Sequence, residues 1–222
     1  TSHAHMLALL ASRLWWANAH VVVHRRIEYA VGKRMFGLGK LKYKRGVNAY
    51  ICVCDQVKGT LVEAGVPEWR VFTVHSSTDP ERFVNAEAPP GLRAELGIPE
   101  DALVIGNIGA LVGHKDHDNL LKAARIVRDK IPRAWFVIVG AGPLHEQLME
   151  KARALHMADR LTMTGFRKDV PELIRIFDLF ALSSSEEGIC STLVETAISG
   201  CPIVAANAGG VSEVVVPEET GI

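Results

Sequence analysis

The chain has 222 residues, no net formal charge and 48% hydrophobic residues, a composition that suits one or two globular domains with a sizeable core. No apolar run reaches the roughly 18 residues that a membrane-spanning helix requires, and no cleavable secretory signal is recognised, so we expect a cytoplasmic protein. Four cysteines occur without a Cys-x-x-Cys spacing, which favours buried thiols over zinc ligands or disulfides.

Basic residues are concentrated near the start of the chain. Residues 1–60 contain ten Lys and Arg residues against two acidic ones, whereas residues 61–222 contain fifteen against twenty-three. Such a segment attracts anionic lipid headgroups, a phosphorylated acceptor or nucleic acid by the same Coulomb interaction, or is simply a solvated face. We find no nucleic-acid-binding motif and expect no nucleic-acid partner. Peripheral contact with an anionic membrane surface, at its inner face, is expected instead.

The first predicted elements belong to part of an α/β domain, residues 1–78. Helical spacing of apolar residues predicts a helix at residues 6–16. Strands are predicted at residues 20–24, 47–54 and 70–75, and a helix at 56–64 is capped by Asp55 and ended by Gly65. A segment rich in Pro and Gly, residues 79–101, is expected to link this domain to the next, with a short helix at 92–96.

Strands and helices then alternate through a second predicted domain, residues 102–222. Strands are expected at residues 103–108, 135–139, 161–164 and 176–182, and helices at 120–130 and 144–155. This alternation predicts a parallel sheet with helices on both faces. Ligands of such sheets bind outside the carboxyl ends of the strands, so we expect the site in the loops that follow them.

Glu187 and Glu195, separated by seven residues, lie across a predicted junction of loop and helix. The loop contains Glu187, and Ser191 or Thr192 is expected to cap the helix. Backbone amides at a helix start lack intrahelical partners and carry the positive end of the helix dipole, so they suit a diphosphate. Glu195 can accept hydrogen bonds from a ribose and Glu187 from a sugar, although isolated glutamates would be ordinary surface charges.

A long ordered pattern surrounds these two glutamates. It comprises Glu187-Gly188, Val194-Glu195-Thr196-Ala197, Gly200-Cys201-Pro202-Ile203-Val204 and Gly209-Gly210-Val211-Ser212-Glu213. The pattern closely resembles the signature of retaining glycosyltransferases of family 4. Members have the α/β GT-B fold, in which two Rossmann-like domains contain parallel sheets. Because members are usually much longer, the resemblance implies that the opening strands of the first domain and the closing helices of the second are absent here.

The resemblance also assigns residues that bind the sugar donor. Lys115 matches the lysine that grips the diphosphate, whereas Ala110 replaces the usual arginine, a loss that His114 can offset. The turn at residues 140–143 resembles the family's Gly-x-Gly-Pro turn, whose glycines permit unusual backbone angles. The loop at residues 165–170 resembles the one beside the nucleotide base, although Arg167 and Lys168 are equally explained as surface charges. The expected donor-binding residues are Gly109, Lys115, Gly165, Arg167, Glu187, Gly188, Ile189, Cys190, Glu195, Gly209 and Gly210, and Glu187 and Lys115 are also expected to be catalytic.

Three further features bear on the chemistry. Asp116-His117-Asp118 spells the Asp-x-Asp triplet by which other glycosyltransferases hold a metal, but either aspartate is more simply a helix cap, and we expect no metal and no cofactor. The family's catalytic histidine would fall just before Thr1. His3 or His5 could replace it on the acceptor side, or could merely pack at the start of a helix. Arg25 and Arg26 are the other residues expected on that side.

The implied activity is transfer of a sugar from a nucleotide-diphosphate sugar to an acceptor hydroxyl, with retention of configuration and without metal, in the synthesis of lipopolysaccharide, glycolipid or polysaccharide. Lys115, the amides near Cys190 and the Gly209-Gly210 turn would stabilise the departing diphosphate. The partners would be a nucleotide sugar and a lipid-linked or glycan acceptor. The alternatives are a GT-B epimerase or phosphorylase, and a fragment that binds nucleotide sugar with little or no transfer.

Overall fold

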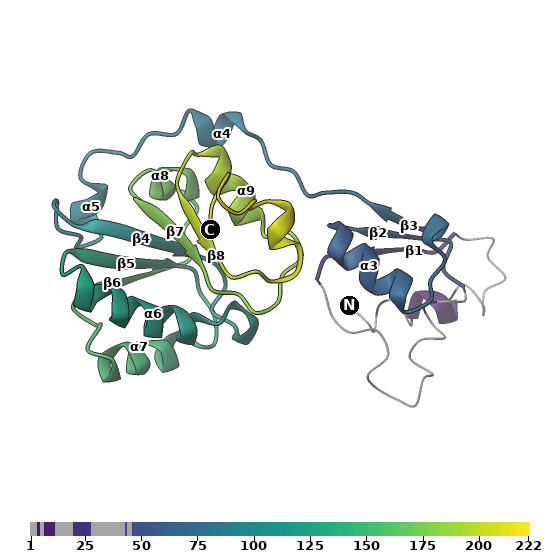
Figure 1. The fold of residues 1–222 in the computed structure, drawn as a ribbon, viewed down its shortest axis with the longest axis horizontal. Helices are drawn as coiled ribbons and strands as arrows, with labels where there is room; N and C mark the ends of the chain where they lie inside the picture. The colour runs from purple at the N-terminus through teal and green to yellow at the C-terminus, as the bar shows by residue number, and fades with distance from the viewer. Residues whose placement is uncertain (1–3, 5–6, 12–19, 28–42, 44–45) are drawn as a thin grey trace. The chain divides into compact units, whose positions relative to one another are not determined.

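The computed structural model describes residues 4, 7–11, 20–27, 43 and 46–222, which form two units of parallel α/β structure (Figure 1). By their contacts, residues Thr1–Ser76 and Glu186–Ile189 belong to the first unit, and residues Ser77–Ser185 and Cys190–Ile222 belong to the second. Among the described residues, no helix combines the length and the apolar character that crossing a membrane requires.

The first unit contains a three-stranded parallel sheet in the order β1, β2, β3. The strands are β1 (Val22–Arg25), β2 (Ala49–Cys52) and β3 (Val71–Thr73), and Tyr50 of β2 pairs with Val71 of β3. Helix α3 (Asp55–Glu63) and the short 3-10 helix η1 (Glu68–Arg70) connect β2 to β3. Val57 and Leu61, one helical turn apart, pack with the strands in a buried core. The three predicted strands and the helix predicted at 56–64 are therefore present, with ends shifted by one or two residues. The predicted capping by Asp55 is wrong, because Asp55 is the first residue of α3 and Cys54 is at the N-cap position.

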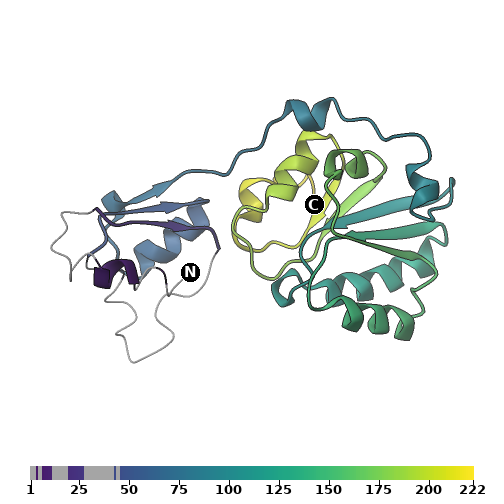
Figure 2. The same cartoon turned by 180° about the vertical axis from the view of Figure 1, so that it is seen from behind.

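The second unit is built on a five-stranded parallel sheet in the order β6, β5, β4, β7, β8. Its strands are β4 (Leu103–Ile108), β5 (Ala134–Val139), β6 (Leu161–Gly165), β7 (Leu179–Leu182) and β8 (Ile203–Ala205). The two longer helices, α6 (His117–Lys130) and α7 (His145–Ala154), cover one face, whereas α8 (Val170–Ile174) and α9 (Ser191–Ile198) cover the other (Figures 1 and 2). The α/β fold with a parallel sheet is confirmed.

Each face of this sheet has its own core, because successive side chains of a strand point to opposite faces. Val104 and Ile108 of β4 pack with residues of α8 and α9 in one cluster, whereas Ile105, between them, packs with Leu121 and other residues of α6 and α7. Burial on both faces explains why the strands are nearly continuous apolar runs in the sequence.

Two elements differ from the predicted bounds for reasons of packing. Strand β7 begins at Leu179 rather than at residue 176, because Ile176 and Phe177 are buried in a turn that continues α8, with amides bonded to the carbonyls of Leu173 and Ile174. Helix α6 begins at His117 rather than at residue 120, because His117 lies on the buried face of the helix with Leu120 and Ala124. Burial alone therefore does not distinguish strand from turn.

The segment predicted as a linker, residues 79–101, packs within the second unit. It contains α4 (Glu81–Val84) and α5 (Leu92–Glu95), and Phe83, Leu92 and Ile98 are buried in the same core as α8 and α9. Two further 3-10 helices, η2 (Gly113–Lys115) and η3 (Gly209–Glu213), follow β4 and β8. The four cysteines are free thiols; Cys52, Cys54 and Cys190 are buried and Cys201 is half-buried.

Gly106, in the middle of β4, provides a test of this packing. A Cβ atom at this position would lie 2.1 Å from Cδ2 of the buried Phe177 ring. We expect Gly106→Ala to lower the free energy of unfolding of the second unit by about 1–3 kcal/mol, because the core is overpacked. Hydrogen exchange of the β4 and β5 amides measures this unit by itself.

Gly113→Ala is the matched control, because a Cβ atom there would meet nothing within 4 Å. Adding Phe177→Leu to Gly106→Ala should relieve the clash, so the combined loss should be smaller than the sum of the two single losses. Additive losses, or wild-type exchange in Gly106→Ala, would contradict this description of the core.

Candidate functional site

The order of the strands places a site at the boundary between β4 and β7. From β4 the chain continues to β5 and β6 on one side of the sheet, whereas β7 and β8 lie on the other side. The loop after β4 therefore leads to α6 on one face, and the loop after β7 leads to α9 on the opposite face. In open α/β sheets, ligands bind outside the carboxyl ends of the strands where the order reverses in this way.

Lys115 lies in the loop after β4, at the end of η2, with its stem against Gly109. A Cβ atom at Gly109 would be 3.5 Å from Cε and 3.6 Å from Cδ of Lys115. The lysine stem therefore lies at van der Waals distance from the place that a Cβ atom of residue 109 would take. The structure brings these two predicted donor-binding residues together at the carboxyl end of β4.

Hydrogen bonds join the loop that carries Lys115 to the loop after β7. Ser183 Oγ donates to the carbonyl of Lys115 at 2.9 Å. The backbone amide of Ser185 donates to the carbonyl of His114 at 2.8 Å, and Ser185 Oγ donates to the same carbonyl at 3.2 Å. The backbone of Lys115 and its neighbour is thus held by the loop across the boundary.

His117 and Asn107 form a buried polar pair beside this loop. The exposed fractions of their side chains are 2% and 3%, and His117 Nε2 lies 3.0 Å from Asn107 Oδ1. Burial, followed by the positive charge of Lys115, lowers the pKa of His117 to about 4, against the smaller opposing effect of Asp116. The imidazole is therefore neutral at physiological pH.

Two glycines in the turn after β5 allow the loops after β4 and β5 to pass close to each other. A Cβ atom at Gly140 would lie 1.9 Å from the carbonyl oxygen of Gly109, and one at Gly142 would lie 2.5 Å from that of Leu111. Gly140 also has a positive φ, of 149°, whereas the φ of Gly142 is not positive. The expectation of unusual backbone angles therefore fits Gly140, while Gly142 is required for close approach.

Helix α9 follows the loop after β7 and carries Glu195. The helix begins at Ser191, and Cys190 occupies the N-cap position without a side-chain bond to the backbone, so the predicted capping by Ser191 or Thr192 is wrong. The first bonds at this end are those from the amides of Leu193 and Val194 to the carbonyl of Cys190, and the amides of Ser191 and Thr192 precede them. Glu195 is half-buried, and burial raises the pKa of its carboxyl, partly opposed by the positive charge of Arg82. The helix therefore offers both an anion-binding end and a carboxyl group of raised pKa.

Glu187, Gly188 and Ile189 group with the first unit by their contacts. Glu187 is only 7% exposed. Their expected place beside Lys115 and Glu195 stays a prediction. Cys190 belongs to the second unit and is buried in the core that includes Leu193 of α9.

Arg167 is held by carboxylates of its own unit. Its guanidinium donates two hydrogen bonds to Asp169, at 2.9 and 2.6 Å, and one to Glu95 at 2.7 Å. These bonds raise the pKa of the guanidinium further and lower that of the Asp169 carboxyl. Arg167 therefore connects α5 to the start of α8, and its expected place beside the donor stays a prediction. Gly165, two residues before, has a φ of 71° and accepts a backbone bond from Gly140.

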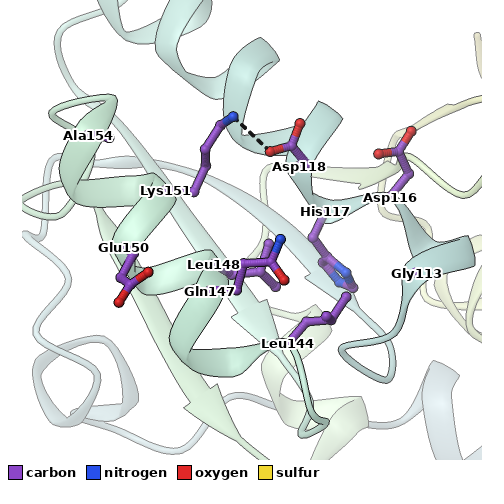
Figure 3. Close-up of a pocket in the computed structure, with 10 residues that line it drawn as sticks. All are labelled: Gly113, Asp116, His117, Asp118, Leu144, Gln147, Leu148, Glu150, Lys151 and Ala154. Atoms are coloured by element: carbon purple, nitrogen blue, oxygen red, sulfur yellow. Dashed lines mark ion pairs between the residues drawn. The ribbon is translucent and has the colours of Figure 1, made fainter.

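The Asp-x-Asp triplet lies at the start of α6, where both aspartates already have partners. Asp116 is the N-cap residue and accepts a hydrogen bond from the amide of Asn119. Asp118 pairs with Lys122 and with Lys151, whose Nζ lies 3.0 Å from Asp118 Oδ1, and these bonds lower the pKa of the Asp118 carboxyl. As Figure 3 shows, the triplet borders a pocket of about 500 Å³ between α6 and α7.

The remaining predicted residues lie in several places. Gly209 and Gly210 are in η3 after β8; Gly209 has a φ of 54° and Gly210 is buried. Arg25 was expected on the acceptor-side surface, but its side chain is 3% exposed and its guanidinium lies over the ring of Tyr43 at 5.7 Å. Arg26 is exposed. His3 and His5 lie outside the described residues.

Sequence reasoning missed the roles of Asn107, Ser183 and Ser185, and treated His117 only as the middle of a triplet. One signal was available for His117. Together with Leu120, Leu121 and Ala124 it follows the i, i+3, i+4, i+7 spacing of a buried helix face. A histidine on such a face requires a buried polar partner, which here is Asn107.

The sequence of this chain is similar to those of known glycosyltransferases. The chain is 28% identical over 232 residues to a GDP-mannose-dependent alpha-(1-6)-phosphatidylinositol monomannoside mannosyltransferase of Mycobacterium tuberculosis, a match that covers 97% of the chain and 59% of that protein. It is 27% identical over 222 residues to UDP-Gal:alpha-D-GlcNAc-diphosphoundecaprenol alpha-1,3-galactosyltransferase of Escherichia coli, covering 95% of the chain and 57% of that protein. The chain thus spans less than two thirds of the length of these relatives.

The fold also matches a solved structure. Anabaena HepE, in complex with UDP and glucose, superposes with a TM-score of 0.83 at 23% identity, covering all of this chain and 61% of that one. Residues 90–222 match the family described as Glycosyl transferases group 1. This match covers more than half of the chain and includes β4 to η3, where Lys115 and Glu195 lie. The chain therefore belongs to the group 1 family of glycosyl transferases.

Proposed function

We propose that this chain is the donor-binding part of a retaining glycosyltransferase that transfers a sugar from a nucleotide-diphosphate sugar to an acceptor hydroxyl. The observation that carries the proposal is the placement of Lys115, whose stem lies on Gly109 at the boundary between β4 and β7. A cation held at this position meets the charge that develops as a diphosphate leaves. Family membership supports the same reaction class.

Each group at the site has a separate task in this mechanism. Negative charge grows on the diphosphate as the glycosidic bond breaks, so groups that bind it more tightly in the transition state lower the barrier. Lys115 supplies a full positive charge, and the first amides of α9 supply the positive end of a helix dipole. Glu195 accepts hydrogen bonds from the ribose hydroxyls, and Glu187 orients the sugar. The phosphate contact that an arginine at residue 110 would make falls to His114.

Transfer is proposed to proceed without a metal ion. The carboxylate of Asp118 is engaged by two lysines, and that of Asp116 caps α6, so neither is arranged to share a metal with a diphosphate. Lys115 provides the compensating charge instead. EDTA should therefore leave activity unchanged, and a loss that Mn²⁺ restores would contradict this part of the proposal.

The substrate classes follow from the relatives. Their names specify GDP-mannose with a phosphatidylinositol acceptor and UDP-galactose with a diphosphoundecaprenol acceptor, and the solved Anabaena protein holds UDP and glucose. We propose a lipid-linked or glycan acceptor in the synthesis of glycolipid, lipopolysaccharide or polysaccharide, at the inner face of the membrane. An epimerase or a phosphorylase is not favoured, because these relatives are transferases.

Lys115→Ala tests the diphosphate contact. We expect the affinity for whichever of UDP and GDP binds the wild type to fall roughly tenfold or more, because a charge-assisted hydrogen bond contributes about 1.5–3 kcal/mol. Calorimetry measures the change directly. Lys122→Ala is the matched control, since Lys122 is a more exposed lysine that pairs with Asp118 on α6. Equal affinities in wild type and Lys115→Ala would remove the assigned role.

Glu195 gives the binding a dependence on pH. Ribose hydroxyls donate to an ionised carboxylate, so binding favours the ionised form, and protonation of Glu195 opposes it. Because burial raises the pKa of Glu195, we expect affinity to fall as the pH is lowered at values where an ordinary glutamate stays ionised. UDP-glucose and GDP-mannose are suitable probes, because their diphosphate is a diester without an ionisation near neutrality.

The matched variant for this measurement is Glu195→Gln. It should bind the nucleotide sugar more weakly at pH 7 and should lose the part of the pH dependence that Glu195 causes. If the wild type and Glu195→Gln respond to pH in parallel, the carboxylate does not contact the donor.

A further inference from the structure

We propose that His117 is a positioning residue for the donor diphosphate, acting through Asn107 to hold Lys115 at the boundary between β4 and β7. This inference rests on the proposed function. It concerns the buried pair of Asn107 on β4 and His117 on α6, neither of which is expected to touch the donor. Four observations support it.

The first observation is that Asn107 joins the two strands where their ladder stops. The backbone pairing of β4 with β7 covers Ile105 with Leu179 and Gly106 with Phe180. At the next residue the side chain of Asn107 takes over, because its Nδ2 donates to the carbonyl of Ala181 at 2.7 Å. The amide group of Asn107 is therefore oriented by β7, and its Oδ1 is directed to His117.

The second observation is that this orientation sets the tautomer of His117. Asn107 Oδ1 can only accept a hydrogen bond, so the proton of the neutral imidazole is on Nε2, 3.0 Å away. The Nδ1 atom has less than 1 Å² of exposed surface and no hydrogen-bond partner. The single bond between Nε2 and Asn107 thus connects the first residue of α6 to the central strand.

The third observation concerns the backbone between Lys115 and His117. Asp116 has a φ of 47°, in the left-handed region that residues other than glycine rarely adopt. The chain before it is held by the bonds from Ser183 and Ser185 to the carbonyls of Lys115 and His114. His117 holds the chain after it. Asp116 is also held by its own bonds, since its amide donates to the carbonyl of Gly113 and its carbonyl accepts from the amides of Asn119 and Leu120. The serines fix the chain on one side of this turn and His117 fixes it on the other, so we expect the position of Lys115 to depend on both.

The fourth observation is electrostatic. Burial, and after it the positive charge of Lys115, lower the pKa of His117. A protonated imidazole would repel the ammonium group of Lys115, whereas the neutral ring does not. Figure 3 shows His117 at the start of α6, where Leu144 and Gly113 are its neighbours in the pocket lining. The buried, neutral state of His117 is therefore compatible with a cation at residue 115.

Two substitutions separate positioning from simple filling of the core. His117→Gln places an amide N–H at about the reach of the imidazole Nε2, so the bond to Asn107 can re-form. His117→Leu fills the space but leaves Asn107 Oδ1 buried without this donor. Leu121→Ala is the control for loss of stability, because Leu121 is 1% exposed on the same helix face and has no polar contact with the loop.

The affinity for UDP or GDP, whichever binds the wild type, is measured in each variant. We expect His117→Leu to weaken it by roughly tenfold, His117→Gln to retain most of it, and Leu121→Ala to change it little. In the Lys115→Ala background, His117→Leu should cause little further loss of affinity, because both changes remove the same contact between Lys115 and the diphosphate. A full additive loss, no loss in His117→Leu, or an equal loss in Leu121→Ala would overturn the inference.

Hydrogen exchange in the absence of nucleotide tests the anchor by itself. His117→Leu should accelerate exchange at the amides of residues 113–117, and His117→Gln should not. Wild-type exchange in His117→Leu would overturn the inference, whatever the nucleotide results. If the wild type binds neither nucleotide while the exchange pattern is as expected, the proposed function fails and the anchor is supported.

Discussion

The second unit depends on the divergence of the chain between β4 and β7. Backbone pairing between these two central strands ends at Gly106 and Phe180, and the loops that follow lead to opposite faces of the sheet. Asn107 bridges the strands just beyond this point, and serines from the loop after β7 hold the loop after β4. A small number of hydrogen bonds therefore keeps two separating segments in register where a ligand is expected to bind.

Electrostatics at this boundary are arranged around Lys115. Burial keeps His117 uncharged, and the carboxylate of Asp118 is bonded to two lysines. In a region of low dielectric constant a cation interacts more strongly with an anion than it would in water. Under the proposed function, the replacement of the usual arginine by Ala110 makes the position of Lys115 more important.

Close packing of backbone, rather than of side chains, shapes the loops at this edge. Gly140 and Gly142 occupy places where a Cβ atom would clash with a carbonyl oxygen of the loop after β4. Glycine costs conformational entropy on folding, so its use at these positions indicates that the loops must approach one another closely. Inside the sheet, Gly106 meets the same requirement against the ring of Phe177.

Much of this description could be predicted from the sequence, because local patterns determine it. Alternating apolar strands and amphipathic helices specified a parallel sheet, and β4 begins and ends at its predicted residues. The glycine and lysine of the loop after β4 were identified from the resemblance of this segment to the glycosyltransferase pattern. Prediction was weaker where a run of apolar residues fits a buried strand and a buried turn equally well. Ile176 and Phe177 were assigned to a strand although they form a turn.

The tertiary structure alone decided which polar groups meet. The side chain of Asn107 bonds to the carbonyl of Ala181 across the boundary between β4 and β7, and these two residues are 74 positions apart in the sequence. The burial of Arg25 and the bond between Arg167 and Glu95 likewise arise from contacts that the tertiary structure makes. Spacing along the chain specifies which face of an element a residue occupies, but hydrogen bonds and desolvation depend on what packs against that face.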